Sequence, residues 1–217
     1  MEAFSATEPI PGLTAPGLDR ASRTRHLLSI IFLYYLPPFL IWTGALPFTW
    51  RFQILTAMTV LMIGYDYLLA IGPKELGIRR DTLKGSLLVN AATSVLLAAG
   101  ISLAFKAGVI RKPTIPAWKA FFVYYVFVSG PSQEFLFRSN FFALMRRANI
   151  GGVVLPIIAS AVTYSFLHLF YNDLITIMVT FVAGLLWGWI YHKYPNFWGV
   201  ALSHSVLGAV SIMVGLI

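Results

Sequence analysis

The feature that most constrains this chain is a series of apolar runs, each about 20 residues long, that recurs from residue 28 onward. At about 1.5 Å per residue, a helix of this length matches the roughly 30 Å core of a bilayer. Lipid offers no partner to backbone amides and carbonyls, so such runs are typical of spanning helices. The sequence predicts an all-α, polytopic membrane helical bundle of about seven transmembrane helices, near 28–48, 53–71, 86–105, 118–145, 153–171, 174–191 and 197–217.

Composition and charge agree with a membrane location. Hydrophobic residues make up 58% of the chain and charged residues 11%, whereas charged residues are about a quarter of a typical soluble domain. The net charge is +8, and the basic residues lie in short segments between apolar runs, as in loops that face anionic lipid. We therefore expect membrane lipids as partners and no nucleic acid. The chain has no cysteine, which excludes disulfides and a cysteine nucleophile.

The polar start of the chain differs from the rest. Residues 1–26 include Pro11 and Pro16 with several small polar residues, and they lack the basic start and A-x-A site of a cleaved secretory signal. We predict a flexible polar N-terminal tail over 1–26 and a single transmembrane domain over 27–217. The first apolar run then acts as an uncleaved signal anchor.

Two of the predicted spans contain helix breakers. Pro37-Pro38 lies inside the first, and Gly130-Pro131 divides the fourth, which is too long for one straight span. We expect breaks in the helix at both places. Broken helices at membrane depth often border a cavity, although a simple packing kink is the alternative.

Orientation follows from the Lys and Arg residues of the loops. Placing the N-terminus in the cytoplasm puts ten of them on that side: Arg20, Arg23, Arg25, Lys74, Arg79, Arg80, Lys84, Arg146, Arg147 and Lys193. The other side holds five: Arg51, Lys106, Arg111, Lys112 and Lys119. Because basic loops stay in the cytoplasm, this asymmetry predicts a cytoplasmic N-terminus.

A small set of ionisable residues lies inside the predicted spans. Glu134 and Arg138 are four residues apart, which places them on one helix face, and His168 and His204 lie in two later spans. A charge near the bilayer centre costs about 2.5–3.5 kcal/mol, so such residues usually face the protein interior. The pair alone is equally consistent with a structural ion pair. Together with two histidines it forms a group that can activate water.

Three motifs in this region resemble those of a known family. The first motif is a Gln-Glu pair followed, after three residues, by an arginine. The second is an aromatic residue four positions before a histidine, and the third is a histidine four positions before a small residue. They read Gln133-Glu134-Phe135-Leu136-Phe137-Arg138, Tyr164-Ser165-Phe166-Leu167-His168 and His204-Ser205-Val206-Leu207-Gly208. In order and spacing they resemble the CAAX protease and bacteriocin-processing (CPBP or Abi) family of intramembrane glutamic endopeptidases, related to the CAAX prenyl endopeptidase type II. The resemblance covers roughly residues 75–210.

The resemblance implies proteolysis in or near the membrane, on a peptide or membrane-protein substrate, by a bacterial protein of the inner (plasma) membrane. In similar proteins the first glutamate and the second-motif histidine activate a water molecule, the third-motif histidine stabilises the oxyanion, and the second glutamate and the arginine hold the site together. Because Gln133 takes the first position here, we expect Glu134 and His168 to activate the water, His204 to polarise the scissile carbonyl, and Arg138 with Gln133 to position the base. No cofactor is implied. A metal ion on the Glu/His cluster is the less favoured reading, because the chain has no H-E-x-x-H motif.

Two positions depart from the family pattern. Gln133 stands where the family has its first glutamate, and an amide can orient a water molecule but cannot accept its proton at neutral pH. Gly208 stands where the family often has asparagine, which removes a donor to the oxyanion, and Asn140 and Asn172 are candidate replacements. Two alternative functions therefore stay open: a non-catalytic immunity or scaffold membrane protein, and a proton-coupled transporter that uses the same residues as a relay.

Overall fold

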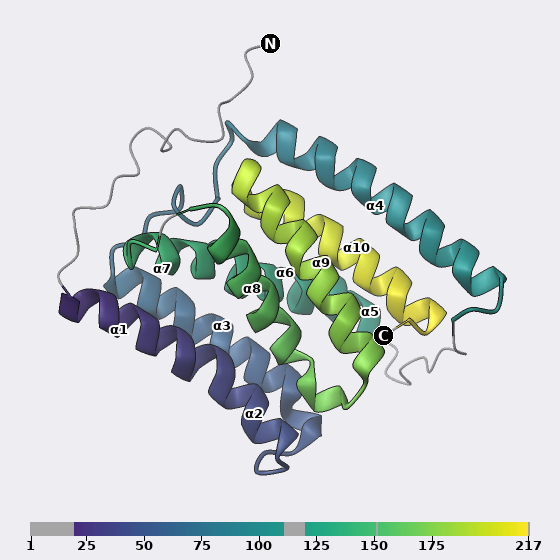
Figure 1. Cartoon of the computed structure of the whole chain (residues 1–217), viewed down its shortest axis with the longest axis horizontal. Helices are drawn as coiled ribbons and strands as arrows, with labels where there is room; N and C mark the ends of the chain where they lie inside the picture. The colour runs from purple at the N-terminus through teal and green to yellow at the C-terminus, as the bar shows by residue number, and fades with distance from the viewer. Residues whose placement is uncertain (1–19, 111–119, 151, 217) are drawn as a thin grey trace.

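The computed structural model describes residues 20–110, 120–150 and 152–216. Every regular element in these ranges is helical, as predicted (Figure 1). The α-helices are α1 (Arg20–Ile30), α2 (Leu36–Trp42), α3 (Arg51–Leu68), α4 (Leu83–Lys106), α5 (Phe121–Tyr124), α6 (Gly130–Glu134), α7 (Phe141–Arg147), α8 (Val154–Leu167), α9 (Leu174–Lys193) and α10 (Phe197–Val214). π-Helical turns occupy Ile31–Tyr35, Tyr125–Ser129 and Phe135–Asn140, and short 3₁₀ turns occupy Phe48–Trp50 and Leu169–Tyr171.

Five helical stretches are long and apolar enough to cross a membrane: Thr24–Trp42, Leu83–Lys106, Val154–Tyr171, Leu174–Lys193 and Phe197–Val214. The other two predicted spans contain α3 and the helical residues from 121 to 145, while residues 118 and 119 lie outside the described residues. Both spans carry polar residues that lower their hydropathy, among them Asp66 in α3 and the Glu134–Arg138 pair. Large apolar side chains such as Val60 and Leu96 are exposed, which suits a surface that faces lipid. The chain is an integral membrane protein, and its count of seven spans is approximate.

The first helix begins earlier than the sequence suggested. Residues 1–19 of the predicted tail lie outside the described residues, but α1 starts at Arg20, so residues 20–26 are helical. The reason is tertiary packing: α1 lies against α7, and His26 is buried there despite the polar composition of its segment. Tertiary contacts of this kind commonly override local preference.

The two predicted helix breaks are present as changes of helix type. A π-helical turn precedes Pro37-Pro38, and another precedes Gly130-Pro131. Proline has no N–H to donate and its ring clashes with the carbonyl four residues earlier, so widening the preceding turn relieves both problems. The chain stays helical through each junction, with Leu36 at φ −62° and Gly130 at φ −59°. The breaks therefore do not interrupt the path of the helix.

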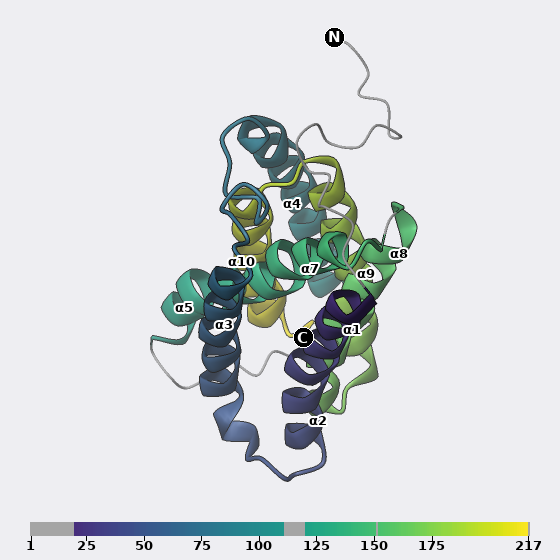
Figure 2. The ribbon, with the colours of Figure 1, turned by 90° about the vertical axis from the view of Figure 1, so that its left-hand side faces the viewer.

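The helical stretch 121–147 forms the centre of the molecule. In Figure 1, α1, α2 and α3 lie on one side of it and α4 and α10 on the other, and Figure 2 shows it crossing between α3 and α10. α8 packs on α9, and α10 packs on both α4 and α6. Every residue from 133 to 145 is buried. This stretch has no lipid-facing side there, so its polar residues meet only other helices.

Small residues bring α8 and α9 unusually close together. A Cβ atom added to Gly184 would lie 2.9 Å from the Cα atom of Ala161, and one added to Gly188 would lie 3.3 Å from the side chain of Ile157. Close backbone approach of this kind is typical of small residues in membrane helices. It also exposes the carbonyl oxygen of Gly184 to Arg138, whose Nη2 donates to it at 3.4 Å.

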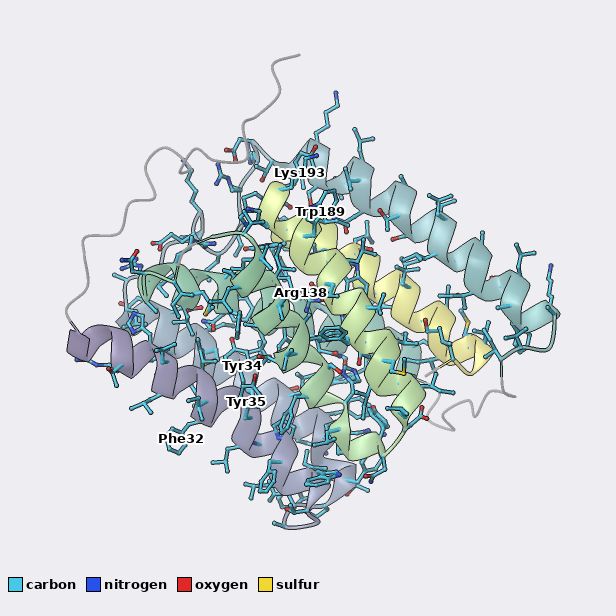
Figure 3. All side chains as sticks on the ribbon, viewed as in Figure 1. Phe32, Tyr34, Tyr35, Arg138, Trp189 and Lys193 are labelled. Atoms are coloured by element: carbon cyan, nitrogen blue, oxygen red, sulfur yellow. The ribbon has the colours of Figure 1, made fainter. Side chains whose placement is uncertain are left out.

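Several connecting loops meet at one end of the bundle. Arg147 donates from Nη2 to Oε1 of Glu75 at 2.7 Å and from Nε to Oε2 at 3.0 Å. The backbone N–H of Phe197 donates to the carbonyl of Gly77 at 3.0 Å, and Lys193, labelled in Figure 3, ends α9 at this end. The loops around residues 75, 147 and 195 therefore lie together, and they carry basic residues assigned above to one side of the membrane.

Candidate active site

Three of the five predicted site residues contact one another in the core. Glu134 comes from α6, Arg138 from the π-helical turn that follows, and His204 from α10. The Nδ1 atom of His204 lies 2.6 Å from Oε1 of Glu134, and Nε of Arg138 lies 3.3 Å from Oε2. Glu134 and Arg138 are fully buried and His204 is 1% exposed. The carboxylate is thus held on both oxygens by groups that carry or can carry positive charge.

The close approach of α10 to the central helix depends on Gly130. A Cβ atom at that position would lie 2.6 Å from Oγ of Ser205. Instead, Ser205 donates to the carbonyl of Val126 at 2.8 Å, which ties α10 to the π-helical turn before the proline. His204 is the neighbour of Ser205 and is brought to Glu134 by the same contact.

Arg138 is surrounded by aromatic rings. Its guanidinium carbon lies 4.7 Å from the ring centre of Tyr164 and 5.6 Å from that of Trp187. Both distances suit a cation–π contact, which is strongest where water is excluded. The pairing of Nε with Glu134 is close but not aligned as a hydrogen bond. Figure 3 shows Arg138 in the middle of the bundle.

Both ring nitrogens of His204 are engaged. Nδ1 donates to Glu134, so Nε2 of the neutral ring is an acceptor, and the hydroxyl of Tyr164 lies 3.4 Å from it. Trp187 stacks on the imidazole with ring centres 4.6 Å apart and planes at 6°. The indole N–H donates to Oγ of Ser203 at 3.0 Å. The orientation of His204 is therefore fixed from three directions.

His168 is held differently and keeps one nitrogen available. Its Nδ1 lies 3.0 Å from the carbonyl oxygen of Tyr164, which makes Nδ1 the donor and leaves Nε2 with a free lone pair. Among the described residues no hydrogen bond to Nε2 is found, and none joins His168 to Glu134. The ring meets Tyr164 edge-on at 5.0 Å. Tyr164 therefore lies between the two histidines and contacts both.

Gln133 faces a separate neighbour. Its Nε2 donates to Oγ of Ser129 at 3.1 Å, while its Oε1 is buried and has no hydrogen-bond partner within the described ranges. Gln133 is 6% exposed and His168 is 8% exposed. Oε1 of Gln133 and Nε2 of His168 are thus free acceptors that lie outside the network of Glu134, His204 and Arg138. Oε2 of Glu134 also has no hydrogen bond, but it lies 3.3 Å from Nε of Arg138.

The candidate replacement donors are committed elsewhere. Asn140 donates from Nδ2 to Asp66 at 2.5 Å and accepts from the hydroxyl of Tyr34 at 2.5 Å, so it stabilises the opposite side of the central helix. Asn172 is exposed and accepts from the indole N–H of Trp42 at 3.0 Å. Neither of these side chains is placed among the histidines.

Sequence reasoning missed the residues that pack around the site. Tyr164 was noted only as the start of a motif, yet its hydroxyl, ring and carbonyl contact His204, Arg138 and His168. Trp187 lies within the apolar run 174–191, and nothing in its local pattern indicates a stack on His204. Across residues 20–110, 120–150 and 152–216, no three His, Cys, Asp or Glu side chains form a group that could hold a metal ion.

These features define a class: a polytopic helical membrane protein with a buried glutamate, arginine and histidine network at its centre. A family model described as type II CAAX prenyl endopeptidase Rce1-like matches residues 115–210. That segment contains all five predicted site residues, and the resemblance to the CAAX protease family is confirmed there. No curated protein and no solved structure gives a match.

Proposed function

We propose that this protein is an intramembrane endopeptidase of the CAAX protease type, with His168 as the general base. The observation that carries the proposal is the free Nε2 of His168, whose other nitrogen is fixed as a donor by the carbonyl of Tyr164. A neutral imidazole with an open acceptor nitrogen is suited to take a proton from water. The family match supports peptide hydrolysis as the reaction class.

In the proposed reaction a water molecule donates a hydrogen bond to Nε2 of His168 and is oriented by Oε1 of Gln133. Its oxygen attacks the carbonyl carbon while one proton passes to His168. The C–N bond of the tetrahedral intermediate then breaks, and the protonated His168 returns the proton to the leaving amine. Glu134 and Arg138 do not contact the water in this proposal. They hold His204 in place, and His204 contacts the hydroxyl of Tyr164, which packs on His168.

This assignment differs from the expectation that Glu134 activates the water together with His168. Oε1 of Glu134 accepts from His204, and Oε2 forms an ion pair with Arg138 without a hydrogen bond, so accepting a proton from water would weaken both contacts. Gln133 has a free carbonyl oxygen but no basicity. Among the described residues of the five, His168 is the basic group that has a free acceptor and no charged group paired with it. No cofactor is part of the proposal, and the proposed substrate is a peptide or a membrane protein.

The test is peptide cleavage by the full chain reconstituted in lipid vesicles. Internally quenched peptides ending in a CAAX sequence, with and without a farnesylated cysteine, serve as probes. We expect the wild type to cleave at least one of them and His168→Ala to lower kcat by about 100-fold or more, the usual contribution of a positioned base. His192→Ala is the matched control, because His192 lies at the end of α9 outside the site. Equal rates for His168→Ala and wild type would refute the proposal.

A second candidate function, a non-catalytic immunity or scaffold protein, is favoured by one observation. Glu134 is paired with His204 and Arg138 in the core, and the position before it carries an amide instead of an acid. Gln133→Glu separates the two functions. If cleavage arises only in that variant, the wild type is a member that has lost activity and the second candidate holds. If the wild type already cleaves, the second candidate is rejected.

We further propose that the end carrying the loops near residues 75 and 147 faces the cytoplasm of a bacterial cell, in its plasma membrane. The support is the clustering of basic residues there, which normally stays on the cytoplasmic side. The chain has no cysteine, so single cysteines can be labelled without background. A thiol reagent that cannot cross the membrane should label Lys106→Cys in intact cells and Lys74→Cys only after permeabilisation. The reverse pattern would overturn the orientation.

A further inference from the structure

The hydroxyl of Tyr125 occupies the space beside Gly208 in the candidate site. A Cβ atom added to Gly208 would lie 1.9 Å from this hydroxyl and 2.7 Å from the ring carbon that bears it. No side chain can therefore stand at position 208 while Tyr125 keeps this place. Gly208 is one turn beyond His204 on α10, and the rings of Tyr125 and His204 have centres 6.3 Å apart. The phenol thus fills the position next to His204 that a residue at 208 would otherwise fill.

This hydroxyl has no other task in the described part of the chain. Two other tyrosine hydroxyls are engaged: that of Tyr164 contacts His204, and that of Tyr124 contacts the backbone carbonyl of Phe52 at 3.3 Å. For Tyr125 no hydrogen-bond partner is found among the described residues, although the residue is only 7% exposed. A phenolic hydroxyl held in a largely apolar environment is a strong donor to any anion placed against it.

Tyr125 also lies in line with the free acceptor of Gln133. Tyr125, Ser129 and Gln133 follow each other at intervals of four residues on the central helix, and Gln133 donates to Ser129 at 3.1 Å. This face is the one that meets α10, where Ser205 donates to Val126. Tyr125 and Gln133 therefore belong to segments of the central helix that pack on α10, and the hydroxyl of Tyr125 lies at Gly208 in that contact.

We infer that Tyr125 is a further catalytic residue, whose hydroxyl donates a hydrogen bond to the oxyanion of the tetrahedral intermediate. The inference rests on the proposed peptide hydrolysis. Tyr125 supplies a donor for the oxyanion. His204 has no free donor, because its Nδ1 donates to Glu134 and its Nε2 contacts the hydroxyl of Tyr164. This role of Tyr125 also explains Gly208, which makes room for the phenol. In the reaction the proton stays on Tyr125 and the bond shortens as negative charge develops on the substrate oxygen.

The experiment compares Tyr125→Phe with wild type in the same vesicles and with the same quenched CAAX peptides. Loss of one oxyanion donor lowers kcat by about 100- to 1000-fold, and we expect this loss with KM changed less than threefold. Tyr124→Phe is the matched control: it removes a neighbouring hydroxyl that contacts Phe52 and Thr56 instead of the site. Thermal unfolding of each variant shows whether the fold is kept.

A second measurement separates a chemical role from a structural one. Incorporation of 3-fluorotyrosine at position 125 keeps the ring and the hydroxyl but makes the phenol more acidic. If Tyr125 must be protonated to act, the alkaline limb of the rate–pH profile moves to lower pH; a packing role leaves that limb in place.

The outcomes distinguish this inference from the function on which it rests. Cleavage by wild type with an unchanged kcat in Tyr125→Phe overturns the role of Tyr125 and leaves the proposed hydrolysis standing. Absence of cleavage by wild type, with His168→Ala identical to it, overturns both. Cleavage by wild type, with a selective fall in kcat for Tyr125→Phe and a shifted profile for the fluorinated protein, supports both.

Discussion

Replacing Gly208 by alanine should destabilise the protein through a single contact. The new methyl carbon would lie 1.9 Å from the hydroxyl of Tyr125, whereas ordinary contacts of such a carbon begin at 3.4 Å. The ring or α10 must therefore move by about 1.5 Å (3.4 − 1.9). Tyr125 is buried beside Phe121, with ring centres 6.0 Å apart, so it cannot swing freely into lipid. Overpacking of this kind costs about 1–3 kcal/mol.

The assay is reversible unfolding in mixed micelles, read as the free energy of unfolding. Tyr125→Ala removes the ring, so Gly208→Ala should cost almost nothing in that background, and the double-mutant cycle should give a coupling of about 1–3 kcal/mol. Gly64→Ala is the control for helix propensity: Gly64 lies in α3 with open space around it, and the change should stabilise by up to about 1 kcal/mol. If Gly208→Ala costs the same with and without the Tyr125 ring, the placement of Tyr125 over Gly208 is refuted.

Two further perturbations probe the charged groups. Glu134→Ala leaves Arg138 buried without its carboxylate, and removing one partner of a buried pair should lower the free energy of unfolding by about 3–5 kcal/mol. Adding Arg138→Met should recover part of that loss. No recovery in the double variant would contradict an ion pair. At the basic end, partial burial raises the pKa of Glu75, but hydrogen bonds from Arg147 outweigh it and hold the pKa below its ordinary value of 4.5. Ionised Glu75 therefore stabilises the fold above pH 4.5, and this stabilisation is lost on acidification. The unfolding temperature of wild type should fall more between about pH 6 and pH 4 than that of Glu75→Gln. Equal falls in the unfolding temperature of the two proteins would exclude the effect.

The fold class and the order of the site residues could be predicted because they depend on local features. Runs of apolar residues report helices in lipid, and the spacing of Glu134 and Arg138 fixes a shared helix face. That the buried charges lie close to a histidine follows from the same logic, since a buried charge needs partners. The exact number of spans could not be read this way, because helices that bury polar residues among other helices lose the hydropathy signal.

The sequence also could not show which histidine pairs with Glu134 and which keeps a free nitrogen. Which histidine reaches Glu134 depends on how α10 rotates and how closely it approaches, and that is set by Gly130 and Ser205. The free nitrogen of His168 depends on a carbonyl of its own helix. Trp187 and Tyr125 enter the site from segments that read as ordinary apolar spans. Such long-range packing leaves no periodic trace in the sequence.

The position of Glu134 and Arg138 on one helix has a consequence for how the protein is made. Their histidine partner lies 70 residues after Glu134, on α10, and each charge alone would cost about 2.5–3.5 kcal/mol in the bilayer. Being four residues apart, the two can neutralise each other as soon as their own helix has formed. The segment that carries both residues can thus enter the membrane with no net charge from this pair before α10 has been synthesised.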